Sequence, residues 1–149
     1  MICIDASVAA KWLFAEEHSE RARALYRRAS IAAERMIAPP LLPIEVTNIV
    51  RQRMRSAKPP DQGLLSLNEA REALALLESF PIEISAPNQL CRQAFEIAVA
   101  HGLPAVYDAQ YIALAELLDC ALWTADQNLV NAVKGKLSFV HWIGNYDPG

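Results

Sequence analysis

The sequence predicts an α/β protein with a three-layer α/β/α architecture, in which helices cover both faces of a central, mainly parallel sheet of about four to five strands. The first observation behind this prediction is that short apolar runs alternate along the chain with longer segments of helical periodicity. The second is size and composition. The chain has 149 residues, 53% hydrophobic and 21% charged, which is typical of one globular domain over residues 1–149.

Five short apolar runs are expected to form the strands. The first stops abruptly at Asp5, and the second is closed by Pro39 and Pro40. Helical segments separate the runs, so most neighbouring strands are expected to be parallel. The expected strands are residues 2–4, 36–38, 81–85, 121–124 and 139–142.

Seven segments carry a helical pattern. In the clearest of them Leu42, Val46, Ile49 and Val50 recur at helical spacing, which predicts one buried face. The expected helices are residues 6–14, 19–33, 41–55, 66–79, 88–101, 105–118 and 129–133.

Capping residues mark several helix ends. Ser19 is expected to be an N-cap, and Ser66 with Glu69 forms the pattern of a capping box. Gly102 is expected to end the helix before it. The turn-rich segment 56–63 is expected to be a loop inside the domain, because apolar patterning resumes directly after it.

Composition and cysteine usage exclude several classes of protein. The net charge of −3 argues against wholesale wrapping of nucleic acid. Cys3, Cys91 and Cys120 form no C-x-x-C pair and are expected to be reduced, buried thiols of a cytoplasmic protein. No apolar run approaches the roughly 20 residues needed to cross a bilayer. No secretory signal precedes the first strand, so neither membrane insertion nor export is expected.

Four acidic residues occupy positions where strands end or helices begin. Asp5 and Asp126 stand just past expected strands, and Glu45 and Asp108 lie in the first turns of expected helices. Strands end and helices begin at one edge of a parallel sheet, and ligands of open α/β sheets bind at that edge. The sequence therefore predicts an acidic pocket there, with Asp108 on the buried face of its helix. Considered by itself, Glu45 is interpreted as a structural cap of its helix.

The chemistry of such a pocket follows from its charge. Four anions packed together need a counter-charge, and carboxylates with water suit Mg²⁺ or Mn²⁺ rather than Zn²⁺. The commonest use of such a pocket is phosphoryl chemistry. Neither a Walker-type glycine loop nor a Ser-His-Asp arrangement is present, so hydrolysis of a phosphodiester by an activated water is favoured. His18, His101 and His141 lack ligand spacing and are expected to be structural or surface residues.

Other charged residues have simpler interpretations. Lys11 lies one helical turn after Ser7 and would point toward the acidic edge, but a solvated surface cation is favoured. The basic residues of the second helix are expected to be a solvated face that pairs with Glu16, Glu17 and Glu20. These basic residues are Arg21, Arg23, Arg27 and Arg28.

Four segments carry the acids in a characteristic order and spacing: IDAS (4–7), PLLPIEVTN (40–48), VYDAQYIALAE (106–116) and LWTAD (122–126). Together they resemble the motifs of PIN-domain ribonucleases, and most closely those of VapC-type toxins of bacterial toxin–antitoxin pairs. The similarity covers essentially the whole chain. The resemblance implies a PIN fold, Mg²⁺- or Mn²⁺-dependent endonucleolytic cleavage of RNA, inhibition by a small VapB-like antitoxin, and a homodimer.

The resemblance also implies roles for individual residues. Asp5 and Asp108 match the family's principal metal ligands, and Glu45 and Asp126 match the acids that complete the metal and water shell. Asn48 is interpreted as a packing or pocket-rim position rather than a catalytic one. The secondary positions around the pocket are Ser7, Thr124 and Asn48.

Alternatives remain open at this level. A PIN nuclease can serve RNA maturation without an antitoxin, and the acids can be a structural ion site in a non-catalytic interaction module. An apolar groove near the first helices and residues 41–55 is expected to receive an antitoxin helix. Some basic residues are candidates for steering RNA, although a solvated helix end is the simpler interpretation. They are Arg51, Arg53, Arg55 and Lys58.

Overall fold

The computed structural model describes residues 1–56 and 63–149. Each strand and helix expected from the sequence is present, with bounds within two residues of those expected. The strands are β1 (Ile2–Ile4), β2 (Met36–Ala38), β3 (Ile82–Ile84), β4 (Ala121–Thr124) and β5 (Val140–Trp142). The helices are α1 (Ala6–Leu13), α2 (Ser19–Ile31), α3 (Leu41–Arg53), α4 (Leu67–Ser79), α5 (Leu90–His101), α6 (Val106–Leu117), α7 (Gln127–Val133) and the 3₁₀ helix η1 (Ile143–Asn145). The expected loop over 56–63 falls largely on residues 57–62, outside the described residues.

The five strands form one parallel sheet in the order β3-β2-β1-β4-β5. In the central strand, Cys3 is in register with Ile37 of β2 and with Leu122 of β4. The chain builds outward from β1 to β3 and then returns to place β4 on the other side of β1. The gap between the carboxyl ends of β1 and β4 is therefore a topological switch point, where α/β sheets bind their ligands.

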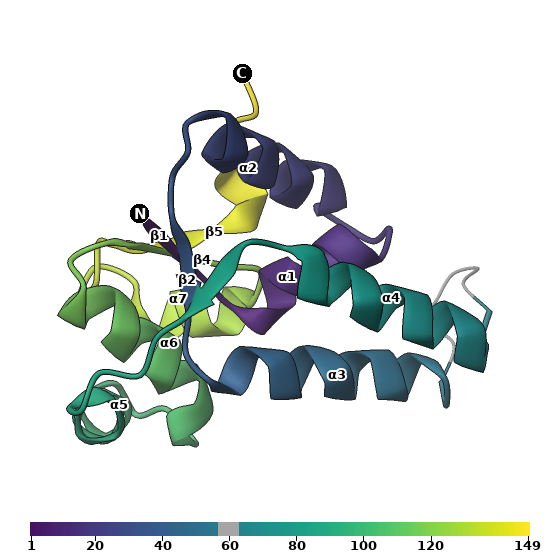
Figure 1. The fold of residues 1–149 in the computed structure, drawn as a ribbon. Helices are drawn as coiled ribbons and strands as arrows, with labels where there is room; N and C mark the ends of the chain where they lie inside the picture. Colours follow the sequence, from purple (N-terminus) through teal and green to yellow (C-terminus); the bar gives the residue numbers. More distant parts are fainter. Residues whose placement is uncertain (57–62) are drawn as a thin grey trace.

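Helices flank the sheet on both sides, as the alternation of elements predicted. Figure 1 shows α1, α3 and α4 on one side of the strands and α5 and α6 on the other. Helix α2 packs on α1, and α7 packs on β5. The α/β/α layering is confirmed.

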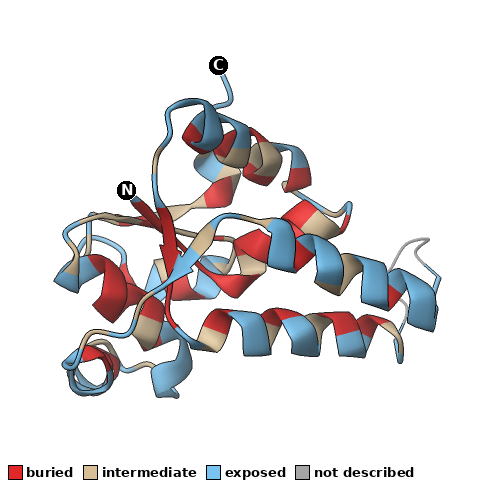
Figure 2. Ribbon diagram, in the orientation of Figure 1, coloured by how far each residue is buried: buried red, intermediate tan, exposed pale blue. Residues whose placement is uncertain are grey.

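The core is built around β1, whose three residues are all buried (Figure 2). Ile4 and Leu122 of neighbouring strands belong to the same buried cluster as Val8 of α1 and Ile112 of α6. The central strand is enclosed from both faces, which explains why its sequence is a continuous apolar run instead of an alternating one.

Two of the predicted helix caps are confirmed. Ser66 and Glu69 form a capping box on α4, in which the serine hydroxyl accepts from the Glu69 amide at 3.2 Å and the glutamate accepts from the Ser66 amide at 2.8 Å. Gly102 ends α5 with a φ of 63°, in the left-handed region that glycine enters without strain.

The expected cap at Ser19 is wrong. Ser19 is the first residue of α2, and His18 precedes it in the left-handed region. The Ser19 hydroxyl instead accepts from the Glu16 amide at 2.8 Å and donates to the Phe14 carbonyl at 2.9 Å. It therefore ties the α1–α2 turn together rather than capping the helix that follows.

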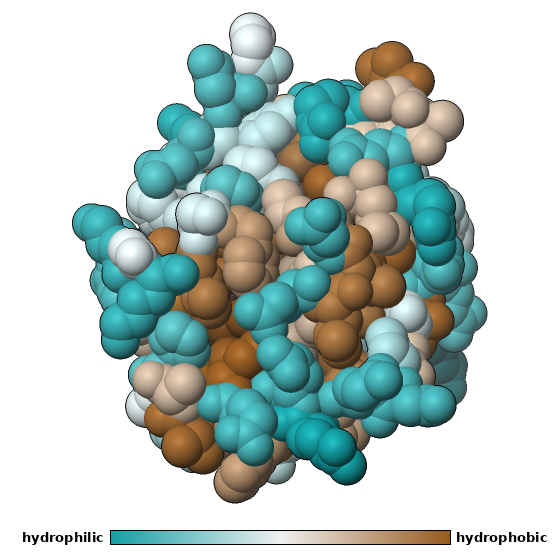
Figure 3. Space-filling model, turned by 90° about the vertical axis from the view of Figure 1, so that its left-hand side faces the viewer, coloured by the Kyte–Doolittle hydropathy of each residue, from teal (hydrophilic) through white to brown (hydrophobic). Residues whose placement is uncertain are grey.

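One side of the molecule carries exposed apolar side chains. Phe95 and Val99 lie one turn apart on α5, and Val106 and Tyr107 begin α6; all four are exposed. Figure 3 views the side that carries these helices and shows apolar residues gathered on it. No helix among the described residues has the length and apolar content needed to span a membrane.

Replacing Leu122 with alanine tests the position of the core. Leu122 is fully buried next to the central strand, so Leu122→Ala should lower the free energy of unfolding by about 2–5 kcal/mol in urea denaturation. Leu76→Ala, at an exposed position of α4, is the matched control and should cost less than about 1 kcal/mol. Equal losses at the two sites would contradict this description of the core.

Candidate functional site

The topological switch point carries two of the predicted acids. Asp5 follows β1 and is the N-cap of α1, and Asp126 follows β4 and is the N-cap of α7. Asp126 Oδ1 accepts from the amides of Asn128 and Leu129 at 2.8 and 3.2 Å. This cap explains why α7 begins two residues before the expected position. Since β1 and β4 pair directly, the two acids stand at the ends of adjacent strands.

Asp5 is buried, with 6% of its surface exposed, and both carboxylate oxygens accept hydrogen bonds. Oδ1 accepts from the Ser7 hydroxyl at 2.6 Å and from the Val8 amide at 3.0 Å. Oδ2 accepts from the Thr124 hydroxyl at 2.5 Å. Because burial keeps water away from the carboxylate, these donors replace its hydration and stabilise the ionised form.

The two hydroxyls that donate to Asp5 are themselves held by the turn after β4. Ser7 Oγ accepts from the Ala125 amide at 2.8 Å, and Thr124 Oγ1 accepts from the Asp126 amide at 2.9 Å. Each hydroxyl thus links a backbone N–H to the carboxylate. The structure places Ser7 and Thr124, two of the predicted secondary positions, directly against Asp5.

Glu45 lies in the second turn of α3 and not at its cap. The N-cap of α3 is Pro40, which makes no side-chain capping bond, so the cap interpretation of Glu45 is wrong. Glu45 Oε2 instead accepts from the hydroxyl of the buried Tyr111 on α6 at 2.5 Å. Tyr111 thereby orients the Glu45 carboxylate across the gap between the two helices.

Asp108 lies in the first turn of α6, as predicted, but it is exposed instead of buried. The buried face of α6 runs through Ala109, Ile112 and Ala113, which leaves Asp108 one position outside that face. The helical pattern placed the carboxylate correctly along the chain but misjudged its rotation around the helix axis.

All four predicted acids line one open pocket of about 230 Å³. Ala6 and Ile49 contribute its apolar surface. Asn48 is exposed on its wall, consistent with a rim position. The polar lining consists of Asp5, Ser7, Glu45, Asn48, Asp108 and Asp126.

Electrostatic coupling connects the acids. Burial raises the pKa of Asp5 to about 6, against the opposing effect of its hydrogen bonds, and the charge of Asp108 adds to the rise. Loss of hydration and then the charge of Asp108 raise the pKa of Glu45, opposed by the bond from Tyr111. Loss of hydration and the charge of Asp126 raise the pKa of Asp108. In Asp5, Glu45 and Asp108, the charge of a neighbouring acid thus adds to the rise in pKa that burial causes.

The donor set fits a hard divalent cation. Among the described residues no three His, Cys, Asp or Glu side chains lie close enough together to form a ready-made metal cluster. Mg²⁺ does not need one, since it commonly retains several waters and binds proteins through only one or two carboxylates. Oxygen ligands and excess negative charge are what such an ion requires, and this pocket offers both.

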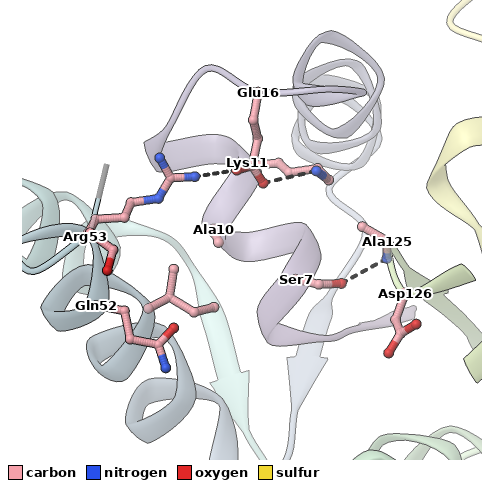
Figure 4. A pocket seen from close by; sticks show the side chains of 10 residues that line it. Ser7, Ala10, Lys11, Glu16, Gln52, Arg53, Ala125 and Asp126 are labelled. Atoms are coloured by element: carbon pink, nitrogen blue, oxygen red, sulfur yellow. Dashed lines mark hydrogen bonds and ion pairs between the residues drawn. The ribbon is translucent and has the colours of Figure 1, made fainter. Parts of the chain in front are cut away.

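A second cavity of about 360 Å³, which we call the basic cavity, adjoins the acidic pocket. Figure 4 shows Glu16 between Lys11 and Arg53 at one end of this cavity and Ser7 with Asp126 at the other. The residues that line it are Ser7, Ala10, Lys11, Glu16, Ile49, Gln52, Arg53, Ser56, Ala125 and Asp126.

Lys11 and Arg53 are both buried, with 8% and 6% of their surface exposed. Their expected roles as solvated cations are therefore wrong. Lys11 donates to Glu16 at 2.9 Å and to the Glu17 carbonyl at 2.8 Å, and Arg53 pairs with the other oxygen of Glu16. The turn between α1 and α2 supplies this shared carboxylate, which makes burial of both cations possible.

The other candidates for steering RNA are three basic residues at or beyond the end of α3. Arg51 and Arg55 are exposed at the end of α3, as expected of a solvated helix end, and Lys58 lies outside the described residues.

The basic residues of α2 make more contacts within the protein than expected of a solvated face. Arg23 pairs with Glu20 at 3.1 Å, as predicted, but Arg28 pairs with Glu34 at 2.9 Å. Arg21 donates to two backbone carbonyls of the C-terminal segment.

Histidines and cysteines are not in the lining of either cavity. His18 and His141 contact the rings of Trp142 and Trp123, consistent with structural roles. The three cysteines are free thiols, but the expectation that all are buried is wrong, because Cys91 is exposed on α5.

Sequence reasoning missed three residues that shape the site. Tyr111 lies three residues after Asp108, a spacing that places it beside the acid on the same helix and that was available in the sequence. Glu16 and Gln52 carry no comparable local signal, because their positions depend on how α1, α2 and α3 pack together.

The raised pKa of Asp5 predicts that the metal-free protein is more stable at low pH. Its native pKa of about 6 exceeds the ordinary value of 3.8, so the native state binds the proton more tightly. This contribution is complete below about pH 4 and is lost as the pH rises through 6. In a chelating buffer the Asp5 contribution to the free energy of unfolding should fall by about 1.4 kcal/mol between pH 5 and pH 7.5, which is about half of the total effect of the shift.

Asp5→Asn should remove most of this pH dependence and should be more stable than the wild type at pH 7.5. The matched control is Asp119→Asn, an exposed site with positive φ that asparagine tolerates, and it should keep the wild-type profile. Denaturation curves at the two pH values measure both effects. A wild-type pH profile in Asp5→Asn would show that Asp5 is not the source.

Comparisons with known proteins identify the family of this chain. The PIN domain family model matches residues 2–135. Ribonuclease VapC3 of Pyrobaculum aerophilum is 33% identical over 130 residues, which cover 86% of this chain and 91% of that protein.

Two solved structures share the fold. Mycobacterium tuberculosis VapC20, a sarcin–ricin loop cleaving toxin, aligns with a TM-score of 0.63 and 17% identity over 89% of this chain and 95% of its own. PAE2754 from Pyrobaculum aerophilum aligns with a TM-score of 0.64 and 22% identity over 96% and 83%. The family match and the identity to VapC3 show that the chain belongs to the PIN-domain family, as its four acidic segments predicted.

Proposed function

We propose that this protein is a metal-dependent endoribonuclease and the toxin of a type II toxin–antitoxin pair. The observation that carries the proposal is the convergence of Asp5, Glu45, Asp108 and Asp126, from four separate elements, on one open pocket. The identity to a protein named as a ribonuclease supports RNA as the substrate.

The proposed cofactor is Mg²⁺ or Mn²⁺. Asp5 and Asp108 are its principal ligands in this proposal, and Glu45 and Asp126 complete the metal and water shell. The chemistry that such an ion supplies is a lowered pKa of water and neutralisation of charge on the phosphate. Hydrolysis forms a bond from water oxygen to phosphorus and breaks the bond from phosphorus to a ribose oxygen.

The protein's own contribution is to hold the acids in place. Ser7 and Thr124 fix both oxygens of Asp5, and Tyr111 fixes Glu45, so the carboxylates meet the substrate in set orientations. Fixed groups of this kind need little reorganisation during the reaction. The buried Asp5 forms the floor of the pocket, and the exposed Asp108 lies on its open side.

This openness favours an enzyme over a metal-stabilised interaction module. An ion kept only for structure is normally closed off by its ligands, whereas a catalytic ion keeps accessible positions. One acid of this pocket is exposed and two are half-buried, which leaves room for a substrate phosphate.

The proposed partners are a VapB-like antitoxin and a second copy of the chain, all in the cytoplasm. A groove of about 240 Å³ between α3, α4 and β3 has the apolar lining that an antitoxin helix needs, including Leu74, Phe80 and Ile84. The exposed apolar residues of α5 and α6 support the homodimer. An RNA-processing nuclease without an antitoxin is the alternative.

The direct test is cleavage of a mixed RNA pool in Mg²⁺ or Mn²⁺, with the cut sites mapped. Cleavage should occur in either metal and stop in EDTA, while circular dichroism shows that the fold persists. Asp108→Asn should lower the rate by at least about a hundredfold. Asp119→Asn makes the same chemical change at an exposed site outside the pocket and should retain wild-type activity.

The outcomes separate the alternatives. Unfolding in EDTA with no cleavage under any condition would support the interaction module and reject the enzyme. Full metal-dependent turnover in Asp108→Asn would reject the assigned ligand.

Growth measurements test the toxin role. Induced expression of the wild type or of Asp119→Asn in a bacterial host should arrest growth, whereas Asp108→Asn should not, because the arrest requires cleavage. Co-expression of the product of a small adjacent gene should restore growth. Normal growth with active wild-type enzyme would favour the role in RNA processing.

A further inference from the structure

Two exposed apolar side chains stand directly before acids of the pocket. Ile44 precedes Glu45 in α3, and Tyr107 precedes Asp108 in α6. Ile44 is 66% exposed and Tyr107 is 59% exposed, although both side chains are large. Single exposed apolar residues are common on proteins, but apolar surface that gathers at the edge of a polar pocket is typical of binding sites.

The contact between Tyr111 and Glu45 fixes which face of α6 meets the pocket. The Tyr111 hydroxyl donates to Glu45 at 2.5 Å, so this face of α6 is turned toward α3. Tyr107 lies four residues before Tyr111, about 6 Å along the helix axis and on nearly the same face. Tyr111 is fully buried and Tyr107 is exposed, so this face passes from the core to solvent within one turn. The Tyr107 ring therefore lies at the outer edge of the site.

The wall formed by α3 continues in the same way. Ile44 lies one turn before Asn48, which is exposed on the pocket wall, and the two residues share a face of the helix. Side chains of a helix lean toward its N-terminus, so Ile44 and Tyr107 both extend past the acids toward the starts of their helices. A ligand that leaves the pocket in this direction meets apolar surface.

The charge of the site makes uncharged contacts important for binding RNA. The pocket carries four acids and the whole chain has a net charge of −3, so the protein's own long-range attraction for a polyanion is weak. Bases that stack on aromatic side chains gain about 1–3 kcal/mol each, and this gain requires no charge. A nucleobase next to the phosphate held at the acids is therefore the ligand that suits the Tyr107 ring.

We propose that Tyr107 stacks on a nucleobase of the RNA, namely a base that flanks the phosphodiester held at the acids. Ile44 adds apolar contact from α3, and the ring takes no part in bond breaking. This inference rests on the proposed ribonuclease function, because the acids define which phosphodiester is cut. Since every base has an apolar face, the contact adds affinity with little preference for sequence.

Steady-state kinetics on a fluorescent RNA that contains a mapped cut site test the proposal. Tyr107→Ala should raise KM about tenfold while kcat stays within about twofold, because binding is lost and chemistry is not. Tyr107→Phe keeps the ring and should keep the wild-type KM within about twofold. The slope of log KM against log salt should be the same in Tyr107→Ala as in the wild type, since no phosphate contact is lost. Leu76→Ala, at an exposed position outside the pocket lining, should behave as the wild type.

A matching change in the RNA locates the base. Substrates with one abasic nucleotide, placed in turn on either side of the cut site, lack one base and keep every phosphate. At one of the two positions the abasic substrate should raise the wild-type KM about tenfold. The same substrate should leave the KM of Tyr107→Ala within about twofold of its value with intact RNA, because the contact is already absent. Independent, multiplicative effects of the two changes at both positions would overturn the proposal.

A contact between two copies of the chain is the competing explanation, because Tyr107 belongs to the exposed apolar surface of α5 and α6. Light scattering at the assay concentration should give the wild-type molar mass for Tyr107→Ala. Phe95→Ala removes a ring of similar exposure, 56%, from α5 and reports on the subunit contact. If both variants lose molar mass and raise KM equally, Tyr107 acts through that contact and the stacking role is rejected.

The results distinguish this proposal from the function on which it rests. If the wild type cleaves no RNA in any metal, the ribonuclease function fails and the stacking role fails with it. If the wild type cleaves RNA but Tyr107→Ala keeps its KM, the stacking role fails and the ribonuclease function stands. Thermal unfolding should be nearly unchanged in Tyr107→Ala, since the residue is exposed, and verifies that the variant is folded.

Discussion

The buried carboxylate of Asp5, at the end of the central strand, is the constraint on which the site depends. Its desolvation raises its pKa to about 6, so the ionised form at neutral pH needs the three donors that surround it. Supplying those donors brings the turn after β4 against the start of α1. Because that turn also carries Asp126, the interaction that satisfies one acid positions a second.

Helix α1 connects the acidic pocket with a cluster of buried ion pairs. Its first turn faces the acidic pocket, and its last turn carries Lys11, which joins Glu16 and Arg53 in the basic cavity. The fields at the ends of a helix favour cations at the C-terminus, where Lys11 lies. Asp5 caps the N-terminus, where a helix favours an anion. The same helix thus stabilises both clusters, and the two cavities meet along its side.

Local patterns predicted the helices and strands well, because apolar periodicity and capping depend on near neighbours in the chain. They failed where a distant partner decides the outcome. Lys11 and Arg53 are buried because Glu16 reaches both of them, and no spacing in the sequence connects α1 with the end of α3. Asp108 is exposed because the packing of α6 on the sheet, rather than the helical pattern, sets the rotation of the helix.

The sequence by itself determined the elements, the four acids and their place at strand ends and helix starts, since residue type and local periodicity are sufficient for these. Only the tertiary structure decided the strand order, and with it the switch point that brings the acids to one pocket. It also decided that Tyr111 orients Glu45 and that a basic cavity adjoins the acids. The physical reason is that burial and charge pairing depend on contacts between segments far apart in the chain, which the packing of the helices on the sheet creates.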